Sequence, residues 1–413
     1  MSGSGVLRYP TFVRFWLADA VSSLGTFVSG LALQLLLIQT LQANQTEVGL
    51  VRAAQWVPYL LFGLLAGVVV DRVRRRPVLI IAESGCAALF AAIAILALTD
   101  LLTVPILAAL VFGVGAASMY FRAAHQSLLP NLVPLALLPA ANARLEQTMA
   151  VAQSIGPLVA GLLVRFLSAP IAMAIDALSY AVSACMLGTL RVTEVVRDKH
   201  PDRHVWRELK EGARWVYRHT TLAPYAIALH LWFFFNSLVT TVLVFFATVE
   251  LHLGAVTIGI ILACAGITGV LGAGLAPALG DRFGLGRVCT AAEWLSPLSY
   301  VLVLIAPPGW GGVVLLVCSQ LLFGFGLGVK GPLDTSYRNA VTPDRLRARM
   351  NATIRSVNWG SIAVSAPLGG LIAATWGNRS AIAVGIVGLV GAALLLMLSP
   401  FRWARMPDHQ TED

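Results

Sequence analysis

Gly67-Val-Val-Val-Asp71-Arg72-Val-Arg74-Arg75-Arg76-Pro77 separates two long apolar runs with one acid and four arginines. A tight basic hairpin between two segments long enough to cross a bilayer is expected at a membrane surface, on the cytoplasmic side. The hairpin also has a second copy, because Asp71-Arg72 recurs as Asp281-Arg282 and Ala82-Glu83 recurs as Ala292-Glu293, both 210 positions later. The sequence therefore predicts two homologous halves in a parallel repeat, offset by about 210 residues.

The composition indicates a membrane protein. Of the 413 residues, 58% are hydrophobic and only 12% are charged, whereas soluble proteins carry roughly 25% charged residues. One soluble core cannot hold this much apolar surface, so the surplus is expected to face lipid, which predicts an all-α integral membrane protein. The formal net charge of +9 is typical of nucleic-acid binding too, but the placement of the basic residues argues against a nucleic-acid partner.

Twelve apolar segments are long enough to span a bilayer, since a helix needs about 20 residues to do so. Their ends are defined to ~2–4 residues, and they cover about 12–38, 47–70, 77–98, 103–126, 140–167, 170–190, 222–248, 255–280, 287–306, 311–333, 346–375 and 379–400. The predicted organisation is a six-helix bundle at 1–190, a cytoplasmic linker with an amphipathic helix at 191–221, a second six-helix bundle at 222–400 and a cytoplasmic tail at 401–413.

The basic residues predict the orientation. If Arg8 is cytoplasmic, nearly all arginines and lysines outside the spans fall on the same side, and only Arg52, Arg165 and Arg379 fall on the other. This positive-inside pattern predicts a multi-pass protein of the plasma membrane with both termini in the cytoplasm. The N-terminus lacks the features of a cleaved signal peptide.

The five cysteines and the linker each allow one further prediction. Cys86, Cys185, Cys264, Cys289 and Cys318 lie in apolar runs without CxxC spacing, which predicts small buried side chains and no disulfide or metal site. In the linker, apolar residues at helical spacing from Trp206 to Val216 predict an amphipathic helix along the inner membrane face, or a solvated helix that connects the halves.

The basic hairpin resembles the signature loop of the major facilitator superfamily, Gly-x-Leu-(Ala/Ser)-Asp-Arg-x-Gly-Arg-(Arg/Lys). Gly67, Asp71, Arg72, Arg75 and Arg76 match the pattern, and Arg74 stands in place of its second glycine. The second copy keeps Asp281, Arg282 and that glycine but lacks the arginine pair. Further stretches, among them Ser127-Leu-Leu-Pro130 and Asp176-Ala-Leu-Ser-Tyr180, resemble a branch of macrolide, multidrug and siderophore exporters.

The resemblance implies a fold and a gate. The fold is two six-helix bundles around a central cavity that opens alternately to each side. In the family, the loop aspartate meets the start of the eleventh helix, where a carboxylate is stabilised by free N–H groups. Asp71 would then be a conformational latch, and Arg72, Arg75 and Arg76 would position the loop. The alternative is that the arginines only anchor to anionic headgroups.

A helix-bend motif is expected in the fifth span. Gly156-Pro157 and Ala160-Gly161 resemble the antiporter signature of the superfamily, and Pro367 stands at the equivalent place in the eleventh span. Small residues allow close approach of helices, and proline bends a helix. Ordinary packing of small residues is the alternative.

Charges inside a membrane are costly and are therefore candidate functional sites. Asp19 in the first span is the leading candidate for binding a proton or a cationic substrate, with a static ion pair to Arg14 or Arg122 as the alternative. Asp176 in the sixth span is the second coupling candidate, or a structural acid. Arg122 itself lies where the superfamily often has a functional arginine.

The remaining intramembrane charges are expected to pair. Glu83 and Glu293 are related by the repeat, which favours a structural role for both, in ion pairs or hydrogen bonds with loop arginines. Lys330 and Asp334 are four residues apart on one helix face, so they are expected to neutralise each other.

Aromatic residues predict a permissive substrate pocket. Trp56, Tyr59, Trp232 and Trp359 provide stacking surfaces that suit large amphipathic cations or polyketides. No nucleotide-binding motif, metal-ligand cluster or nucleophile is recognisable, so the sequence predicts no nucleotide, no metal, no cofactor and no enzymatic activity.

Together these features predict a secondary transporter that exports a hydrophobic or amphipathic small molecule, a drug or secondary metabolite, by proton antiport and alternating access. Its expected partners are the substrate, protons and membrane lipid, and it is expected to be a monomer. The alternatives are a dedicated siderophore or metabolite exporter, or an importer. A membrane enzyme or sensor is a remote alternative.

Overall fold

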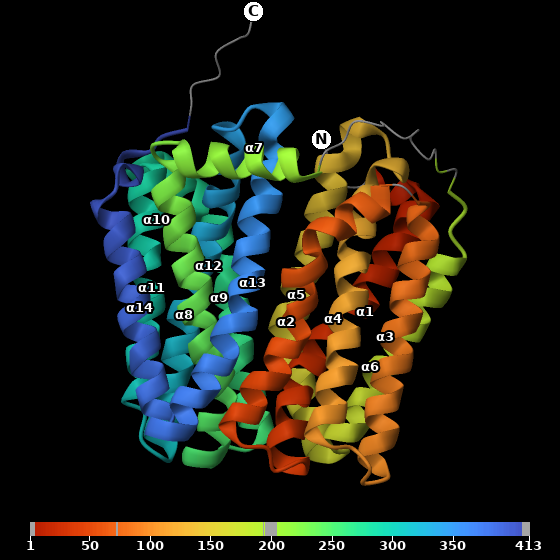
Figure 1. Ribbon diagram of the computed structural model, residues 1–413, viewed down its shortest axis with the longest axis vertical. Coiled ribbons are helices and arrows are strands. Elements are labelled where there is room, and N and C mark those ends of the chain that lie inside the picture. The colour runs from red at the N-terminus through yellow and green to blue at the C-terminus, as the bar shows by residue number, and fades with distance from the viewer. Residues whose placement is uncertain (1–4, 72, 193, 195–204, 407–413) are drawn as a thin grey trace, which may run out of the picture. The chain divides into compact units, whose positions relative to one another are not determined.

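The computed structural model describes residues 5–71, 73–192, 194 and 205–406, with the side chains of all of them except 64–68, 71 and 205–209. Throughout this range the regular structure is helical, without a strand, as Figure 1 shows. This confirms the predicted all-α fold. The chain divides into two compact units: unit 1 is Met1–Pro201 with Leu253–Ala263, and unit 2 is Asp202–His252 with Cys264–Asp413. The exact domain limits given above stay predictions.

Unit 1 is built on long antiparallel helices. They are α1 (Pro10–Leu35), α2 (Gln45–Asp71), α3 (Arg75–Leu98), α4 (Val104–Leu128), α5 (Leu138–Phe166) and α6 (Ala169–Gly188). In this unit α1 packs against α5 and α6, α3 packs against α4 and α6, and α2 packs against α4. The first and sixth helices are therefore neighbours, and each of them can contribute side chains to one site.

Unit 2 repeats this arrangement. It holds α7 (Val205–Arg218), α8 (Leu222–Phe245), most of α9 (Ala255–Phe283), α10 (Leu285–Glu293), α11 (Leu295–Leu304), α12 (Trp310–Ala340), α13 (Asp344–Trp376) and α14 (Asn378–Leu398). Helix α8 packs against α13 and α14, as α1 does against α5 and α6.

The internal repeat also extends to the backbone conformation at the ends of two equivalent helices. Helix α1 ends in a π-helical turn at Leu36–Thr40, and α8 ends in one at Phe246–Glu250, 210 residues later. After each turn one residue takes a left-handed conformation, Gln42 and His252, both with φ of 53°. A non-glycine residue in this region is uncommon, so a coincidence at the same offset is strong support for two homologous halves.

Ten helices of the described chain are long and apolar enough to cross a membrane. The other two predicted spans, 47–70 and 287–306, fall on α2 and on the pair α10–α11, and the count of twelve remains a prediction. The second of these was wrongly expected to be one helix. It is broken at Trp294, because Pro297 has no N–H group to donate to the Glu293 carbonyl.

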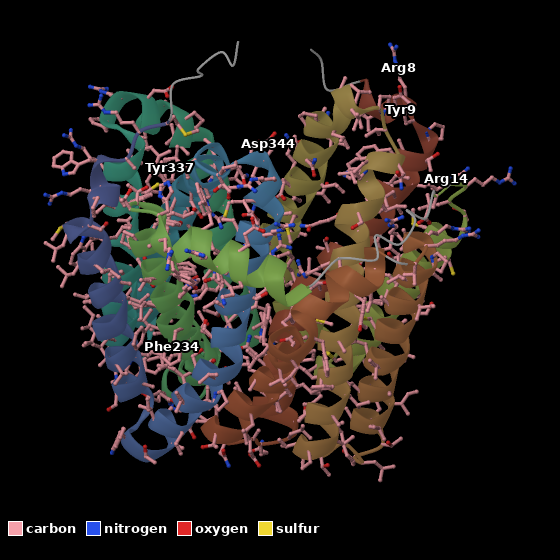
Figure 2. The ribbon with its side chains drawn as sticks, turned by 45° about the horizontal axis from the view of Figure 1, so that its top comes forward. Arg8, Tyr9, Arg14, Phe234, Tyr337 and Asp344 are labelled. Carbon is pink, nitrogen blue, oxygen red and sulfur yellow. The ribbon has the colours of Figure 1, made fainter. Side chains whose placement is uncertain are left out.

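Large apolar side chains cover the outer faces of both units, as the sticks in Figure 2 show. Ile81 is 71% exposed and Val387 is 72% exposed, which is expected where lipid replaces water. Two of the cysteines share this environment: Cys185 and Cys318 are exposed, so their predicted burial was wrong, whereas Cys86 and Cys289 are buried.

Helix α7 occupies the predicted linker. Val216 is fully buried in the core of unit 2, and a Cβ atom on Gly212 would lie only 2.9 Å from the Arg349 carbonyl oxygen of α13. Glu211 forms ion pairs with Arg345 and Arg349 at the start of α13. The helix is therefore attached to unit 2 and is not a freely solvated connection.

Candidate functional site

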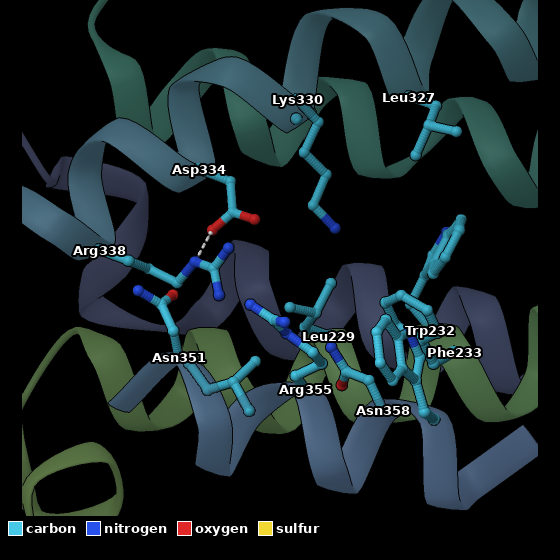
Figure 3. Close-up of a pocket in the computed structure, with 13 residues that line it drawn as sticks. Leu229, Trp232, Phe233, Leu327, Lys330, Asp334, Arg338, Asn351, Arg355 and Asn358 are labelled. Carbon is cyan, nitrogen blue, oxygen red and sulfur yellow. Dashed lines mark ion pairs between the residues drawn. The ribbon is translucent and has the colours of Figure 1, made fainter. Parts of the chain in front are cut away.

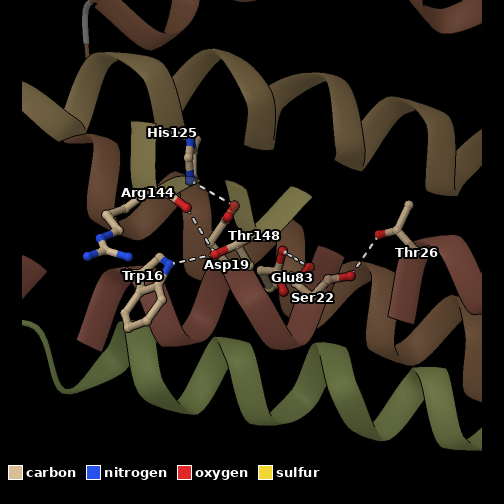
Figure 4. A network of polar contacts seen from close by, with 8 residues as sticks. All are labelled: Trp16, Asp19, Ser22, Thr26, Glu83, His125, Arg144 and Thr148. Carbon is tan, nitrogen blue, oxygen red and sulfur yellow. Dashed lines mark hydrogen bonds and ion pairs between the residues drawn. The ribbon is translucent and has the colours of Figure 1, made fainter. Parts of the chain in front are cut away.

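The first candidate site lies among α1, α3, α4 and α6 of unit 1, where Figure 4 shows Asp19 facing His125 of α4. His125 Nε2 is 3.0 Å from Asp19 Oδ1, and both side chains are largely buried. The His125 ring stacks on Phe15 with 4.5 Å between ring centroids. Sequence analysis did not single out this histidine, because its partner is on another helix and no spacing links the two.

The partners considered for Asp19 are engaged elsewhere. Arg14 donates to the carbonyl of Thr189 at the end of α6. Arg122 lies within hydrogen-bonding reach of the Tyr59 hydroxyl on α2. Asp19 therefore has a histidine as its neighbour, and a histidine can exchange a proton at ordinary pH, whereas an arginine cannot.

Two further acids lie deeper in the same unit. Glu83 on α3 is 2% exposed and accepts a hydrogen bond from Ser22 Oγ of α1 at 3.0 Å. Asp176 on α6 is 1% exposed and accepts one from Ser179 Oγ at 2.9 Å. The loop arginines expected beside Glu83 are not its partners. The Ser183 hydroxyl lies close to Glu83 and the Ser29 hydroxyl lies close to Asp176, but among the described residues neither second oxygen, Glu83 Oε2 or Asp176 Oδ2, has a hydrogen bond of good geometry.

Gly25 allows Asp176 to reach this position. A Cβ atom at Gly25 would lie 2.1 Å from Asp176 Oδ1 and 2.1 Å from Ser179 Oγ. The next residue of α1, Thr26, has its Oγ1 2.9 Å from the hydroxyl of Tyr180, which lies one turn after Asp176 on α6. Helices α1 and α6 thus meet closely enough that the buried carboxyl group touches the α1 backbone.

The three acids of unit 1 lie close to one another. Asp19 and Asp176 both lie near enough to Glu83 to act on its charge. Yet in the part of the chain that the structure describes, no three acid, histidine or cysteine side chains are arranged to hold a metal. The arrangement can bind and release protons at carboxyl groups separated by serine and threonine hydroxyls.

The signature hairpin is held by a residue that sequence analysis missed. Arg75 N–H donates to Glu194 Oε2 at 2.5 Å, and Arg76 N–H donates to Glu194 Oε1 at 2.9 Å, so one carboxylate caps the first turn of α3. The Arg76 side chain donates to the carbonyls of Leu187 and Gly188 at the end of α6. The Arg76 side chain therefore joins the hairpin to the end of α6, and its positioning role stays a prediction.

The acids of the two hairpin copies end equivalent helices. Asp71 is the last residue of α2, and Asp281 and Arg282 lie in the last turn of α9, exposed. Arg72 and the side chain of Asp71 lie outside the described residues, and Gly67 contributes only helical backbone. The latch role of Asp71 therefore stays a prediction.

The helix-bend residues lie at close helix contacts within each unit. A Cβ atom at Gly156 would lie 2.4 Å from Phe27 Cβ of α1, and Pro157 and Ala160 lie inside α5 with Gly161. In unit 2, Pro367 lies inside α13, and a Cβ atom at Gly369 would lie 2.8 Å from the Leu238 carbonyl of α8. The prolines thus occur where α5 and α13 pack on the equivalent helices α1 and α8.

The second candidate site is a cavity in unit 2 between α8, α12 and α13, with a volume of about 270 Å³ (Figure 3). Trp232 and Trp359, two of the predicted pocket aromatics, line it with the charged side chains Lys330, Asp334, Arg338 and Arg355. The other two predicted aromatics, Trp56 and Tyr59, contact each other on α2 with ring centroids 5.3 Å apart.

The charges of this cavity pair differently from the prediction. Lys330 forms a buried ion pair with Glu293 of α10, and Asp334 pairs with Arg338 at 2.7 Å, one turn further along α12. The direct ion pairs of Lys330 and Asp334 are thus with Glu293 and Arg338, although Lys330 still lies near enough to act on the charge of Asp334. The loop arginines expected beside Glu293 are also not its partners. Glu83 and Glu293 occupy equivalent places, but among the residues that the structure describes an ion pair is seen for Glu293 and not for Glu83.

These observations define a class: a helical membrane protein of two homologous halves with buried charges in each. Solved transporters share the fold. The nucleoside transporter NupG superposes with a TM-score of 0.77 over 94% of this chain and 98% of that chain at 15% identity. A bacterial homologue of the lysosomal transporter Spinster gives 0.73 over 94% and 97% at 14% identity.

The family follows from the sequence comparison. The family model described as transmembrane secretion effector matches residues 1–413, so the chain belongs to this family of major facilitator transporters. An uncharacterized MFS-type transporter, y4rN of Sinorhizobium fredii, is 25% identical over 352 residues, 83% of this chain and 84% of that protein. The multidrug efflux pump Tap of Mycobacterium bovis is 26% identical over 220 residues, about half of each chain (51% and 51%).

Proposed function

We propose that this transporter exports a hydrophobic or amphipathic small molecule across the plasma membrane in exchange for protons. The observation that carries the proposal is the acid cluster of unit 1, in which Asp19 faces His125 while Glu83 and Asp176 lie buried behind it. A transporter without an energy-coupling group would have little use for three carboxyl groups at membrane depth, where such charges are costly.

The acids and the histidine of the cluster provide groups at which a proton can bind within unit 1. Asp19 and His125 are the more exposed members of the cluster, with side chains that are 14% and 16% exposed, whereas Glu83 and Asp176 are almost completely buried. An ionised carboxylate at Glu83 or Asp176 raises the free energy of the folded protein when no cation lies beside it, and binding a proton removes that charge. Proton uptake and release at these acids can therefore favour different packings of α1 against α6, which is the coupling that alternating access requires.

The cavity of unit 2 is the proposed place of the substrate. Its wall combines Trp232, Phe233 and Trp359 with a few polar groups, as expected for a site that binds an amphipathic molecule. Asp71 is the proposed latch, with Arg75 and Arg76 positioning its hairpin, and both chain termini are proposed to lie in the cytoplasm. The sequence similarity to the efflux pump Tap supports export.

Dye efflux from cells that express the protein tests the proposal. Export should stop when a protonophore dissipates the proton gradient, and Asp19→Asn should reduce it at least about tenfold, as for a lost proton-transfer group. Asp100→Asn is the matched control, since Asp100 is exposed and its left-handed backbone, with φ of 56°, also suits asparagine. If export survives both the protonophore and Asp19→Asn, proton antiport through this cluster is wrong.

A further inference from the structure

The wall of the unit 2 cavity presents more positive than negative groups. Lys330, Arg338 and Arg355 line it, whereas Asp334 is the one lining acid among the described residues. Glu293, which pairs with Lys330, is 1% exposed and lies behind the wall. Because Glu293 occupies one side of the ammonium group, a ligand in the cavity meets the remaining N–H donors of Lys330 and not the acid.

A hydrogen-bond relay turns a further donor toward the cavity. His230 Nδ1 is 2.6 Å from Asn358 Oδ1, and the Tyr217 hydroxyl of α7 is 2.9 Å from His230 Nε2. When Tyr217 donates to Nε2, Nδ1 carries the hydrogen and donates to Asn358 Oδ1. The amide oxygen of Asn358 is then used, and its NH2 group is left on the cavity side, toward Lys330 (Figure 3).

The rest of the wall is apolar and flat. Trp232 donates to Ser296 Oγ at 2.9 Å and stacks on Phe323, so its indole ring is held in place. Leu327 and Ile354 complete the apolar part. A volume of about 270 Å³ is slightly below the range of roughly 300–1,000 Å³ for small-molecule pockets, which is room for a polar group with one ring system.

We propose that this cavity binds the anionic end of the substrate, so that the transported class is an aromatic amphipath bearing a carboxylate. The proposal rests on the proposed function in taking this cavity as the place of the substrate. It departs from the expectation of amphipathic cations, which the aromatic residues alone suggested. Lys330 and Asn358 bind the carboxylate oxygens, and the ring lies against Trp232.

The charge beside Asn358 disfavours a cationic ligand. An ammonium group in that position would approach the ammonium group of Lys330 in surroundings of low dielectric, where like charges repel strongly; Arg338 adds little to this repulsion, because Asp334 pairs with it. A carboxylate gains charge-assisted hydrogen bonds from the same groups. Selectivity by charge is therefore expected even where ring and size are identical.

Binding to the purified full-length protein in detergent, measured by isothermal titration calorimetry, tests the proposal. The probes share one ring: 6-methoxy-2-naphthylacetate, its uncharged primary amide and 2-(6-methoxy-2-naphthyl)ethylamine. The carboxylate should bind at least about tenfold more tightly than the amide, because hydrogen bonds to charged groups are the stronger kind. Decanoate, which has the charge and a lipid-like chain without the ring, should bind more weakly than the naphthyl acid.

Two variants tie the preference to the cavity. Asn358→Asp replaces the amide donor by an acid of the same shape and should abolish the preference for the carboxylate. The double variant Lys330→Met/Glu293→Gln removes the cation without leaving its partner unpaired, and should do the same. Asn44→Asp is the matched control: Asn44 caps α2 through its side-chain oxygen, and aspartate caps equally well.

The outcomes are distinct from those of the efflux assay, because equilibrium binding needs no proton gradient and has no direction. Equal affinity for the acid and the amide, tighter binding of the amine, or absence of binding by all naphthyl probes would overturn the anionic class while leaving proton-coupled export untouched. A charge preference that persists in Asn358→Asp would also overturn it. Tighter binding of decanoate than of the naphthyl acid would assign the site to a lipid and likewise overturn it.

Discussion

Lys330→Met should destabilise the protein more than any substitution of a surface charge. The Lys330 side chain is 9% exposed, and its ammonium group forms an ion pair with Glu293 and lies 5.6 Å from the ring centroid of Trp232. Methionine has nearly the same length and no charge, so the change removes the cation and keeps the volume. Glu293 is then left buried with no cation beside it.

The expected cost follows from that burial. Removing one partner of a buried ion pair costs about 3–5 kcal/mol, because the remaining charge keeps its desolvation penalty. For a domain of 150–250 residues each kcal/mol lowers Tm by about 2–4 °C, which gives a decrease of roughly 6–20 °C. The double variant Lys330→Met/Glu293→Gln should recover most of it, since replacing both members of such a pair is often nearly neutral.

Thermal unfolding of the purified protein in detergent, at one scan rate, measures these differences. Arg345→Met is the control, because Arg345 is 78% exposed and 3.7 Å from Glu211, and an exposed pair contributes less than about 1 kcal/mol. If Lys330→Met unfolds at the same temperature as Arg345→Met, or if the double variant is less stable than the single one, the buried pair does not have the energetic role argued here.

Three further predictions concern other parts of the structure. Glu194→Gln should raise amide exchange in the first turn of α3 about fivefold, because a charged cap at a helix start contributes about 1 kcal/mol; unchanged exchange would contradict the capping. Gly25→Ala should destabilise the protein by about 1–3 kcal/mol through the clash with Asp176, whereas Gly30→Ala in open space should not. Burial lowers the pKa of His219, whose Nδ1 accepts from two N–H groups at the start of α8. The unfolded chain then binds more protons, so stability should fall as pH drops below about 6.5, and His219→Asn, which keeps an acceptor, should remove that dependence.

The halves and their helices were predictable because they follow from local patterns. Apolar run length, basic hairpins and the repeat of Asp71-Arg72 as Asp281-Arg282 are properties of adjacent residues, and the structure confirms the all-helical repeat. The break of the helix at Trp294 was not predicted, although Pro297 is a sequence signal for it. The length of an apolar segment does not distinguish one bent helix from two short helices.

The partners of the charged residues were the least predictable part. His125 faces Asp19 from α4, Glu194 caps α3 from beyond α6, and Glu293 reaches Lys330 from α10. Each contact joins helices that are distant in sequence, so its existence depends on helix rotation and crossing, which no spacing along the chain expresses. Arg338 is the exception, because its distance of four residues from Asp334 is a helix-face signal that could have been used.

By itself the sequence determined that this chain is helical, membrane-embedded and duplicated. The apolar length of each segment can be read from that segment alone, and the duplication can be read by comparing segments 210 residues apart. Tertiary structure alone decided that Glu83 and Glu293, equivalent in the repeat, have different surroundings: a serine hydroxyl for one and a lysine for the other. The physical reason is that the free energy of a buried charge depends on what other helices bring within a few ångströms of it.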